Sequence, residues 1–169
     1  MTFKRLFLTS ALCTALVVSV PGLAADAPLT VNIKRLSMDT ALRIAQAAIK
    51  ECRKRGVQVA VTVVDRGGDP QVMLRDVLAM DITVPISRKK AHTALAFNSA
   101  LSAMAGRFKN PHSVAKIDEL IVSPGGVPVN IGGSIMAGVG VSGAPDGKVD
   151  EACAAAGVAA VQDDLELGD

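Results

Sequence analysis

The feature that most constrains the fold is a glycine-rich segment near the C-terminus, residues 124–153. It contains a turn, a short strand, a second turn, and then an apolar strand over residues 134–142 that holds several glycines, followed by a capped helix. Glycine weakens a strand, so it is usually kept inside one where another backbone or a ligand comes close. The pattern predicts an inner strand of a sheet, closely approached by a neighbouring element.

Residues 138–143 match the dinucleotide-binding pattern G-x-G-x-x-G letter for letter. That motif works when its glycines form the turn after a strand, with the pyrophosphate at the N-terminus of the next helix and an acidic residue about 20 positions further on. Here the glycines lie within the predicted strand, and no further strand is predicted after the last helix. The sequence therefore favours a packing role for these glycines over nucleotide binding.

Residues 1–24 have the features of a secretory signal peptide. Lys4 and Arg5 give a positive start, an apolar stretch covers residues 6–20, and small residues lead to Ala24. The alternative is a membrane anchor, but the apolar stretch is shorter than the roughly 20 residues that span a bilayer. We expect cleavage after Ala24 and a mature protein in the periplasm or outside the cell.

Removing 24 of the 169 residues leaves 145, the size of one domain with a single core. We expect an N-terminal extension over residues 25–36 and the domain itself over residues 37–166. The chain has 18 basic and 16 acidic side chains, and loss of the two basic ones in the signal peptide balances them. Because nucleic-acid binding needs a basic stripe, and Tyr and Trp are absent as stacking platforms, we expect no nucleic-acid partner. No other large apolar run follows the signal peptide, so we expect no membrane span in the mature chain.

Apolar residues at helical spacing follow Ser37, which suits a helix N-cap, and a β-branched run at residues 57–64 predicts a buried strand. The turn at 65–70 then predicts an antiparallel hairpin. The order helix, two strands, helix, three strands, helix predicts an α+β fold in which helices pack on one five-stranded antiparallel sheet. The further predicted elements are a returning strand at 71–75, a helix at 86–104, strands at 119–122 and 134–142, and a helix at 149–165.

Cys52 and Cys153 are the two cysteines outside the signal peptide, and each lies on a predicted helix. Export would place them in an oxidising compartment, where pairing is permitted. Neither has the C-x-x-C spacing of a zinc or redox site. A disulfide between the first and last helices and two buried free thiols both remain open.

Several short motifs occur in series along the chain. They are Val-Val-Asp-Arg-Gly-Gly-Asp-Pro at 63–70, Lys-Ala-x-Thr-Ala at 90–94, Gly-Gly-Val-Pro-Val at 125–129, Gly-Val-Ser-Gly-Ala-Pro at 140–145, and Asp-Glu-Ala-Cys-Ala-x-Ala-Gly at 150–157. In this order they resemble the GlcG/HbpS family of small haem-binding proteins, over about residues 37–161. The loop at residues 77–80 departs from the family pattern, which has a Gly-Ala pair there.

The resemblance implies a profilin-like α+β fold, assembly into homo-oligomers, and haem binding as in several members. Some members are implicated in haem handling or redox-sensing signalling outside the membrane. Others lie beside glycolate or diol metabolism. The resemblance therefore implies haem as a cofactor and leaves the role of the chain open.

A haem iron needs an axial donor, most often a histidine. His92 lies on the predicted helix beside Thr93, and His112 lies in a loop where we expect it to be solvated. Neighbouring side chains diverge by about 100° around a helix, so His92 and Thr93 cannot easily face one iron. Ligand chemistry favours His92 as the metal ligand and the resemblance favours Thr93, while a surface helix histidine is the alternative.

Other side chains could complete such a site. Arg88 and Lys89 could pair with haem propionates, or could be part of a solvated helix face with Lys90. Met80 and Met73 could serve as soft ligands or pocket lining, or simply pack.

No serine lies in a G-x-S-x-G elbow, no divalent-metal spacing is present, and we predict no catalytic residue. The leading hypothesis is an exported, oligomeric haem- or tetrapyrrole-binding protein, with its pocket between the helix at 86–104 and the neighbouring strands. A second is an enzyme or accessory protein of hydroxyacid or diol metabolism that uses a similar pocket. A third is a structural module whose oligomer surface is its purpose.

Overall fold

The computed structural model describes residues 28–109 and 117–168. The predicted signal peptide and His112 lie outside the described residues. The chain divides into two units, Met1–Asn32 and Ile33–Asp169, and all helices and strands described below belong to the second. None of the helices in the described ranges is long and apolar enough to cross a membrane.

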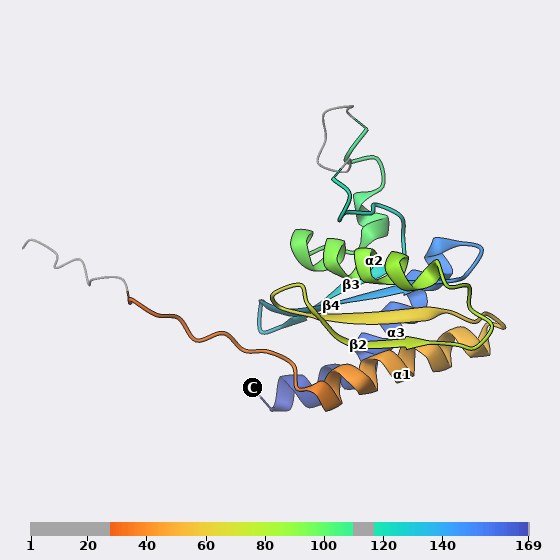
Figure 1. The fold of residues 1–169 in the computed structure, drawn as a ribbon. Coiled ribbons are helices and arrows are strands. Elements are labelled where there is room, and N and C mark those ends of the chain that lie inside the picture. Colours follow the sequence, from red (N-terminus) through yellow and green to blue (C-terminus); the bar gives the residue numbers. More distant parts are fainter. Residues whose placement is uncertain (1–27, 110–116, 169) are drawn as a thin grey trace, which may run out of the picture. The chain divides into compact units, whose positions relative to one another are not determined.

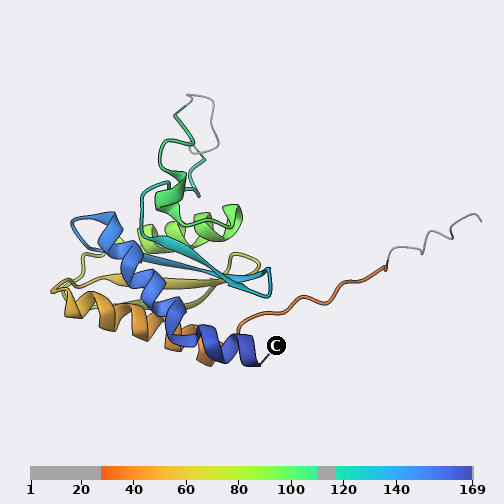
Figure 2. The same cartoon turned by 180° about the vertical axis from the view of Figure 1, so that it is seen from behind.

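In its described residues the second unit has three α-helices and a four-stranded sheet, so the α+β prediction is confirmed. The strands are antiparallel in the order β2-β1-β4-β3. Helices α1 and α3 pack together on one face of the sheet, and α2 packs on the other (Figures 1 and 2). The elements are α1 (Met38–Lys54), β1 (Ala60–Asp65), β2 (Pro70–Arg75), α2 (Thr83–Phe97), the 3-10 helix η1 (Leu101–Met104), β3 (Gly126–Ile131), β4 (Ser134–Ser142) and α3 (Gly147–Leu167).

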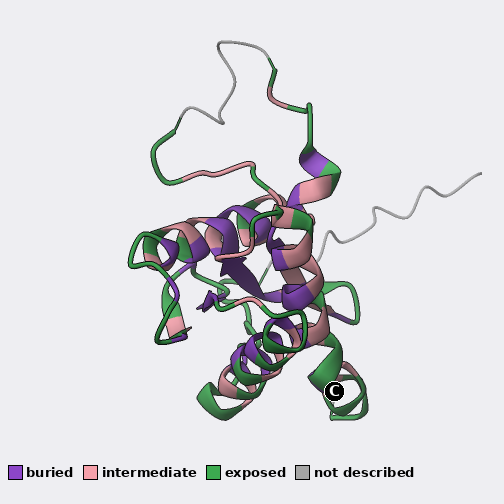
Figure 3. Cartoon of the chain, turned by 90° about the vertical axis from the view of Figure 1, so that its right-hand side faces the viewer, coloured by how far each residue is buried: buried purple, intermediate pink, exposed green. Residues whose placement is uncertain are grey.

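The main hydrophobic core lies between the sheet and the helices α1 and α3. Buried residues lie in the sheet and on the helix sides that face it (Figure 3). Every residue of β1 is buried. Because successive side chains of a strand point to opposite faces, Val61 and Val63 of β1 and Val139 and Val141 of β4 share the core face with Ile44 of α1.

The same alternation places the glycines of β4 on the face covered by α2. A Cβ atom added at Gly140 would lie 2.0 Å from the carbonyl oxygen of Ser87, and one at Gly138 would lie 2.2 Å from that of Ala91. The backbone of α2 therefore rests directly on the backbone of β4. The predicted packing role of these glycines is confirmed, since β4 is an inner strand paired with β1 and β3.

Two predictions about the middle of the chain are wrong. The helix expected to run to residue 104 ends at Phe97, because Asn98 adopts the left-handed conformation with φ 45°. Asparagine tolerates this conformation, which reverses the chain as at many helix C-termini. Residues 119–122 form no strand, so the described sheet has four strands and not five.

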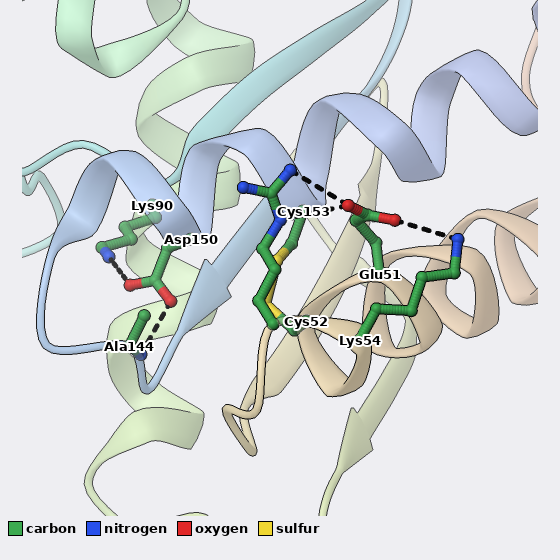
Figure 4. The surroundings of a disulfide bond; sticks show 8 residues. Glu51, Cys52, Lys54, Lys90, Ala144, Asp150 and Cys153 are labelled. Atoms are coloured by element: carbon green, nitrogen blue, oxygen red, sulfur yellow. Dashed lines mark hydrogen bonds and ion pairs between the residues drawn. A yellow bond between two sulfur atoms is a disulfide. The ribbon is translucent and has the colours of Figure 1, made fainter.

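The predicted N-cap of the first helix is confirmed, while the last helix is two residues longer at each end than the predicted 149–165. The Ser37 hydroxyl caps α1 by accepting a hydrogen bond from the backbone N–H of Thr40, and Asp146 caps α3. Of the two alternatives left open for the cysteines, the structure has the disulfide: Cys52 of α1 is bonded to Cys153 of α3 (Figure 4).

Candidate functional site

An apolar cavity of about 300 Å³ lies between the first turns of α2 and the β1–β2 hairpin. This volume is at the lower end of the range for ligand pockets. Thr62, the most deeply placed polar residue of its wall, has its hydroxyl 2.8 Å from the Ser87 hydroxyl, so that polar group is already satisfied. The lining residues are Thr62 of β1, Pro70 and Met73 of β2, and Val84, Pro85 and Arg88 of α2.

The loop from β2 to α2, which precedes the α2 residues of the cavity wall, exposes several large apolar side chains. Val77, Leu78, Met80 and Ile82 are all exposed, with Leu78 at 77%. Hydrogen bonds hold the loop, for example from the Leu78 N–H to the Gln58 side chain at 3.0 Å, 20 positions earlier in the chain. Where exposed apolar side chains form one large patch, that patch often marks an interaction site.

His92 lies beside the cavity without lining it. Val84, Arg88 and His92 are spaced four apart and therefore follow one face of α2, and the first two line the cavity. The imidazole packs on the hairpin turn, where a Cβ added at Gly68 would lie 2.8 Å from its Cδ2. Its Nδ1 is buried and has no hydrogen-bond partner among the described residues. The ring thus holds a nitrogen whose bonding capacity is unused.

Thr93 lies on a different side of the helix and is fully buried. Its hydroxyl donates to the carbonyl oxygen of Lys89 at 2.7 Å and accepts from the Ile121 N–H at 3.0 Å. To reach an iron, Thr93 would have to give up these bonds. The structure therefore separates the two candidate axial donors, as the helical geometry led us to expect.

The three side chains of the basic run at residues 88–90 have different surroundings. Arg88 is exposed at the cavity and forms an ion pair with Glu119 at 3.5 Å. The Lys89 ammonium donates to the backbone carbonyl of Asp118. Met80, the remaining predicted site residue, lies on the exposed apolar loop. Of the predicted residues, the structure thus brings Arg88 and Met73 to the cavity wall, while His92, Thr93, Lys89 and Met80 do not line it.

Lys90, which the sequence grouped with a solvated face, is instead buried against Asp150. Burial raises the pKa of Asp150, while hydrogen bonds from the Ala144 N–H and from Lys90 act in the opposite direction. Ser87, Lys90, Ala91 and Ala94 form the buried stripe of α2, at spacings of three and four. That helical periodicity is the sequence signal that could have identified Lys90 as buried.

Fold and cavity together define a small α+β protein with an apolar cavity between a helix and a hairpin. The chain belongs to the HbpS-like family, described as "Haem degrading protein HbpS-like", whose family model matches residues 36–159. The family resemblance expected from the sequence motifs is confirmed.

Individual proteins extend the comparison. An uncharacterized 15.0 kDa protein from the dhaT-dhaS intergenic region of Citrobacter freundii is 28% identical over 117 residues, covering 66% of this chain and 82% of that protein. The crystal structure of HbpS is 35% identical with a TM-score of 0.75, covering 81% of this chain and 97% of HbpS. A double mutant of HbpS from Streptomyces reticuli is 34% identical with a TM-score of 0.74, covering 83% of this chain and 97% of that chain.

A complex of PduOC with heme shares the fold at a TM-score of 0.68 and 24% identity, and covers 75% of this chain and 95% of that chain.

Proposed function

We propose that the protein binds haem, or another tetrapyrrole, against the apolar cavity between α2 and the β1–β2 hairpin, and that it serves in haem handling or sensing. Membership of the HbpS-like family supports this, as does the heme bound to PduOC, which has the same fold. The single observation that carries the proposal is the apolar cavity at the start of α2, in a chain segment whose preceding loop exposes large apolar side chains.

The residues present fit such a group. A tetrapyrrole is flat and wide, so its ring would extend from the cavity onto the exposed side chains of Val77 and Leu78. Arg88 at the cavity wall is placed to donate charge-assisted hydrogen bonds to a propionate. His92 follows Arg88 by one turn on the same face of α2, its Nδ1 has no partner among the described residues, and imidazole is the commonest axial donor to haem iron. Bound haem would supply an iron centre able to bind small ligands or change oxidation state.

Titration of the purified protein with hemin tests this proposal. We expect a shifted Soret band that saturates at one haem per chain and changes in position or intensity in His92→Ala. Thr93→Val should mainly lower the stability of the protein, because its hydrogen bonds are lost, and it should change the Soret band less than His92→Ala does. Absence of a saturable shift would exclude haem as the ligand.

We also propose that the chain is exported to the periplasm or the medium and assembles into homo-oligomers. The charged start and apolar stretch of residues 1–24 support export, and family membership supports assembly. Expression of the full chain should give a periplasmic or secreted product whose N-terminus is Ala25. Recovery of an unprocessed cytoplasmic product would contradict export, and a monomeric mass in sedimentation would contradict assembly.

A further inference from the structure

A second groove, of about 390 Å³, lies between α1 and the end of β2, on the sheet face opposite α2. We propose that it binds a small organic anion that carries a neutral hydrogen-bond donor, such as a hydroxyl, next to its charged group. This site is separate from the haem cavity and does not depend on it. The groove is lined by Gln46, Ile49, Lys50 and Arg53 of α1 and by Leu74, Arg75 and Asp76 at the end of β2.

The charges of the groove favour an anion. Lys50, Arg53 and Arg75 are cationic, and Asp76 is the one acidic residue that lines the groove. Lys50 is exposed and its ammonium group has no partner in the part of the chain that the structure describes. It lies one helical turn before Arg53, so the two cations follow the same face of α1. A carboxylate in the groove would meet at least one donor that no other group occupies.

Asp76 supplies the second and independent observation. It is only 4% exposed, and its Oδ1 accepts hydrogen bonds from Nε and Nη2 of Arg53, the former at 2.9 Å. Its Oδ2 is buried and has no partner among the described residues. A buried carboxylate oxygen without a donor is costly, and such groups are uncommon in folded proteins. The geometry therefore calls for a donor at Oδ2 from outside the chain.

The nature of that donor follows from Arg53. Because its guanidinium group already pairs with Asp76, an incoming ammonium group would meet a fixed positive charge beside its acceptor. A neutral O–H or N–H donor avoids this repulsion. Ile49 and Leu74 line the groove with apolar surface and suit a short alkyl chain. A carboxylate with a neighbouring hydroxyl and a branched alkyl tail satisfies all three features, whereas inorganic phosphate leaves the apolar wall uncovered.

Calorimetric titration with matched probes tests the proposal. We use 2-hydroxy-4-methylpentanoate, its deoxy analogue 4-methylpentanoate, the ammonium analogue leucine, and inorganic phosphate. The hydroxy acid should bind at least tenfold more tightly than each of the other three. Lys50→Gln, at an exposed position, should weaken its binding at least tenfold, and Lys148→Gln on the exposed surface of α3 should leave it unchanged.

The comparison of the hydroxy and deoxy acids needs no variant, so it stands even if replacement of Asp76 prevents folding. Where Asp76→Asn folds, it should reduce the preference for the hydroxy acid over the deoxy acid. Equal affinity for these two acids would overturn the proposal, since a water would then satisfy Asp76. Tighter binding of leucine or phosphate, or full affinity in Lys50→Gln, would also overturn it.

Discussion

The ammonium nitrogen of Lys90 lies 3.0 Å from Oδ2 of Asp150, and the two side chains are only 4% and 3% exposed. The other carboxylate oxygen of Asp150 accepts a hydrogen bond from the Ala144 N–H at 2.9 Å (Figure 4). The pair joins α2 to the first turn of α3 across 60 positions of sequence. Gly125 lies against it, where an added Cβ would be 2.5 Å from the Lys90 ammonium. The pair therefore sits at a junction with no spare space.

Breaking this pair from one side should be strongly destabilising. Lys90→Met leaves Asp150 as a buried charge without its cation, and such losses cost about 3–5 kcal/mol. Chemical denaturation should show this loss in the free energy of unfolding. The double variant Lys90→Met with Asp150→Asn should lose less than the two single variants together. If the loss of unfolding free energy in the double variant equals the sum of the losses in the two single variants, the two groups do not act as a pair.

The pH dependence of stability should carry the signature of Asp150. Burial raises the pKa of Asp150 in the folded protein above its ordinary value of 3.8, so the folded state binds this proton more tightly than the unfolded chain does. The contribution of the Asp150 proton to the free energy of unfolding is therefore complete below the ordinary pKa, and it is lost as pH rises through the raised pKa of the folded state. In urea denaturation between about pH 3 and 7, the free energy of unfolding of the native protein should therefore contain a contribution that decreases as pH rises. Asp150→Asn should lack this contribution. A pH profile identical to that of the native protein would contradict this assignment.

Local signals in the sequence were enough for much of the fold. Ser37 marked the start of α1, the turn at 65–70 marked the hairpin, and the glycines of 134–142 marked an inner strand. These features depend on neighbours in sequence or on the two-residue period of a strand. Asn98 ended α2 earlier than expected, and its side chain accepts a hydrogen bond at 2.9 Å from Asn130, a partner 32 positions away that local signals do not reveal.

The candidate site was less predictable for the same reason. Whether Thr93 or His92 has a free donor atom depends on Ile121 and on Gly68, which are far away in sequence. The burial of Lys90 depends on Asp150, and the groove beside Asp76 depends on α1 packing against β2. Composition and periodicity identified the helix that carries the haem candidates, but tertiary contacts decide which of its side chains are available.

The disulfide should contribute substantially to stability. Cys52 and Cys153 are 101 residues apart, so their bond restricts most of the unfolded domain. Loss of a native disulfide from a small secreted domain costs about 2–5 kcal/mol. Thermal unfolding should occur at a lower temperature in the presence of a reductant that breaks the bond. A double variant, Cys52→Ala with Cys153→Ala, should unfold at a similarly lowered temperature and should not respond to the reductant.

The close contact between α2 and β4 predicts that Gly140→Ala will be poorly tolerated. The added Cβ would lie 2.0 Å from Ser87 O and 2.4 Å from Ala91 N, and both are backbone atoms that cannot move without shifting the helix. We expect a loss of about 3 kcal/mol or more, at the upper end for overpacked cores. Gly56→Ala is the control, because its φ of 74° disfavours alanine although nothing lies within 4 Å. A smaller loss at position 140 than at 56 would show that α2 can move off the sheet.

The exposed apolar loop should matter for haem binding and not for folding. Leu78 is 77% exposed, so Leu78→Glu should leave the free energy of unfolding nearly unchanged. If a porphyrin ring covers this side chain, the variant loses about 1.5–3 kcal/mol of apolar burial, which corresponds to a roughly tenfold to hundredfold weaker affinity for hemin. Leu167→Glu is the matched control, since Leu167 is 88% exposed at the far end of α3. Equal hemin affinity in both variants would mean that the ring does not reach the loop.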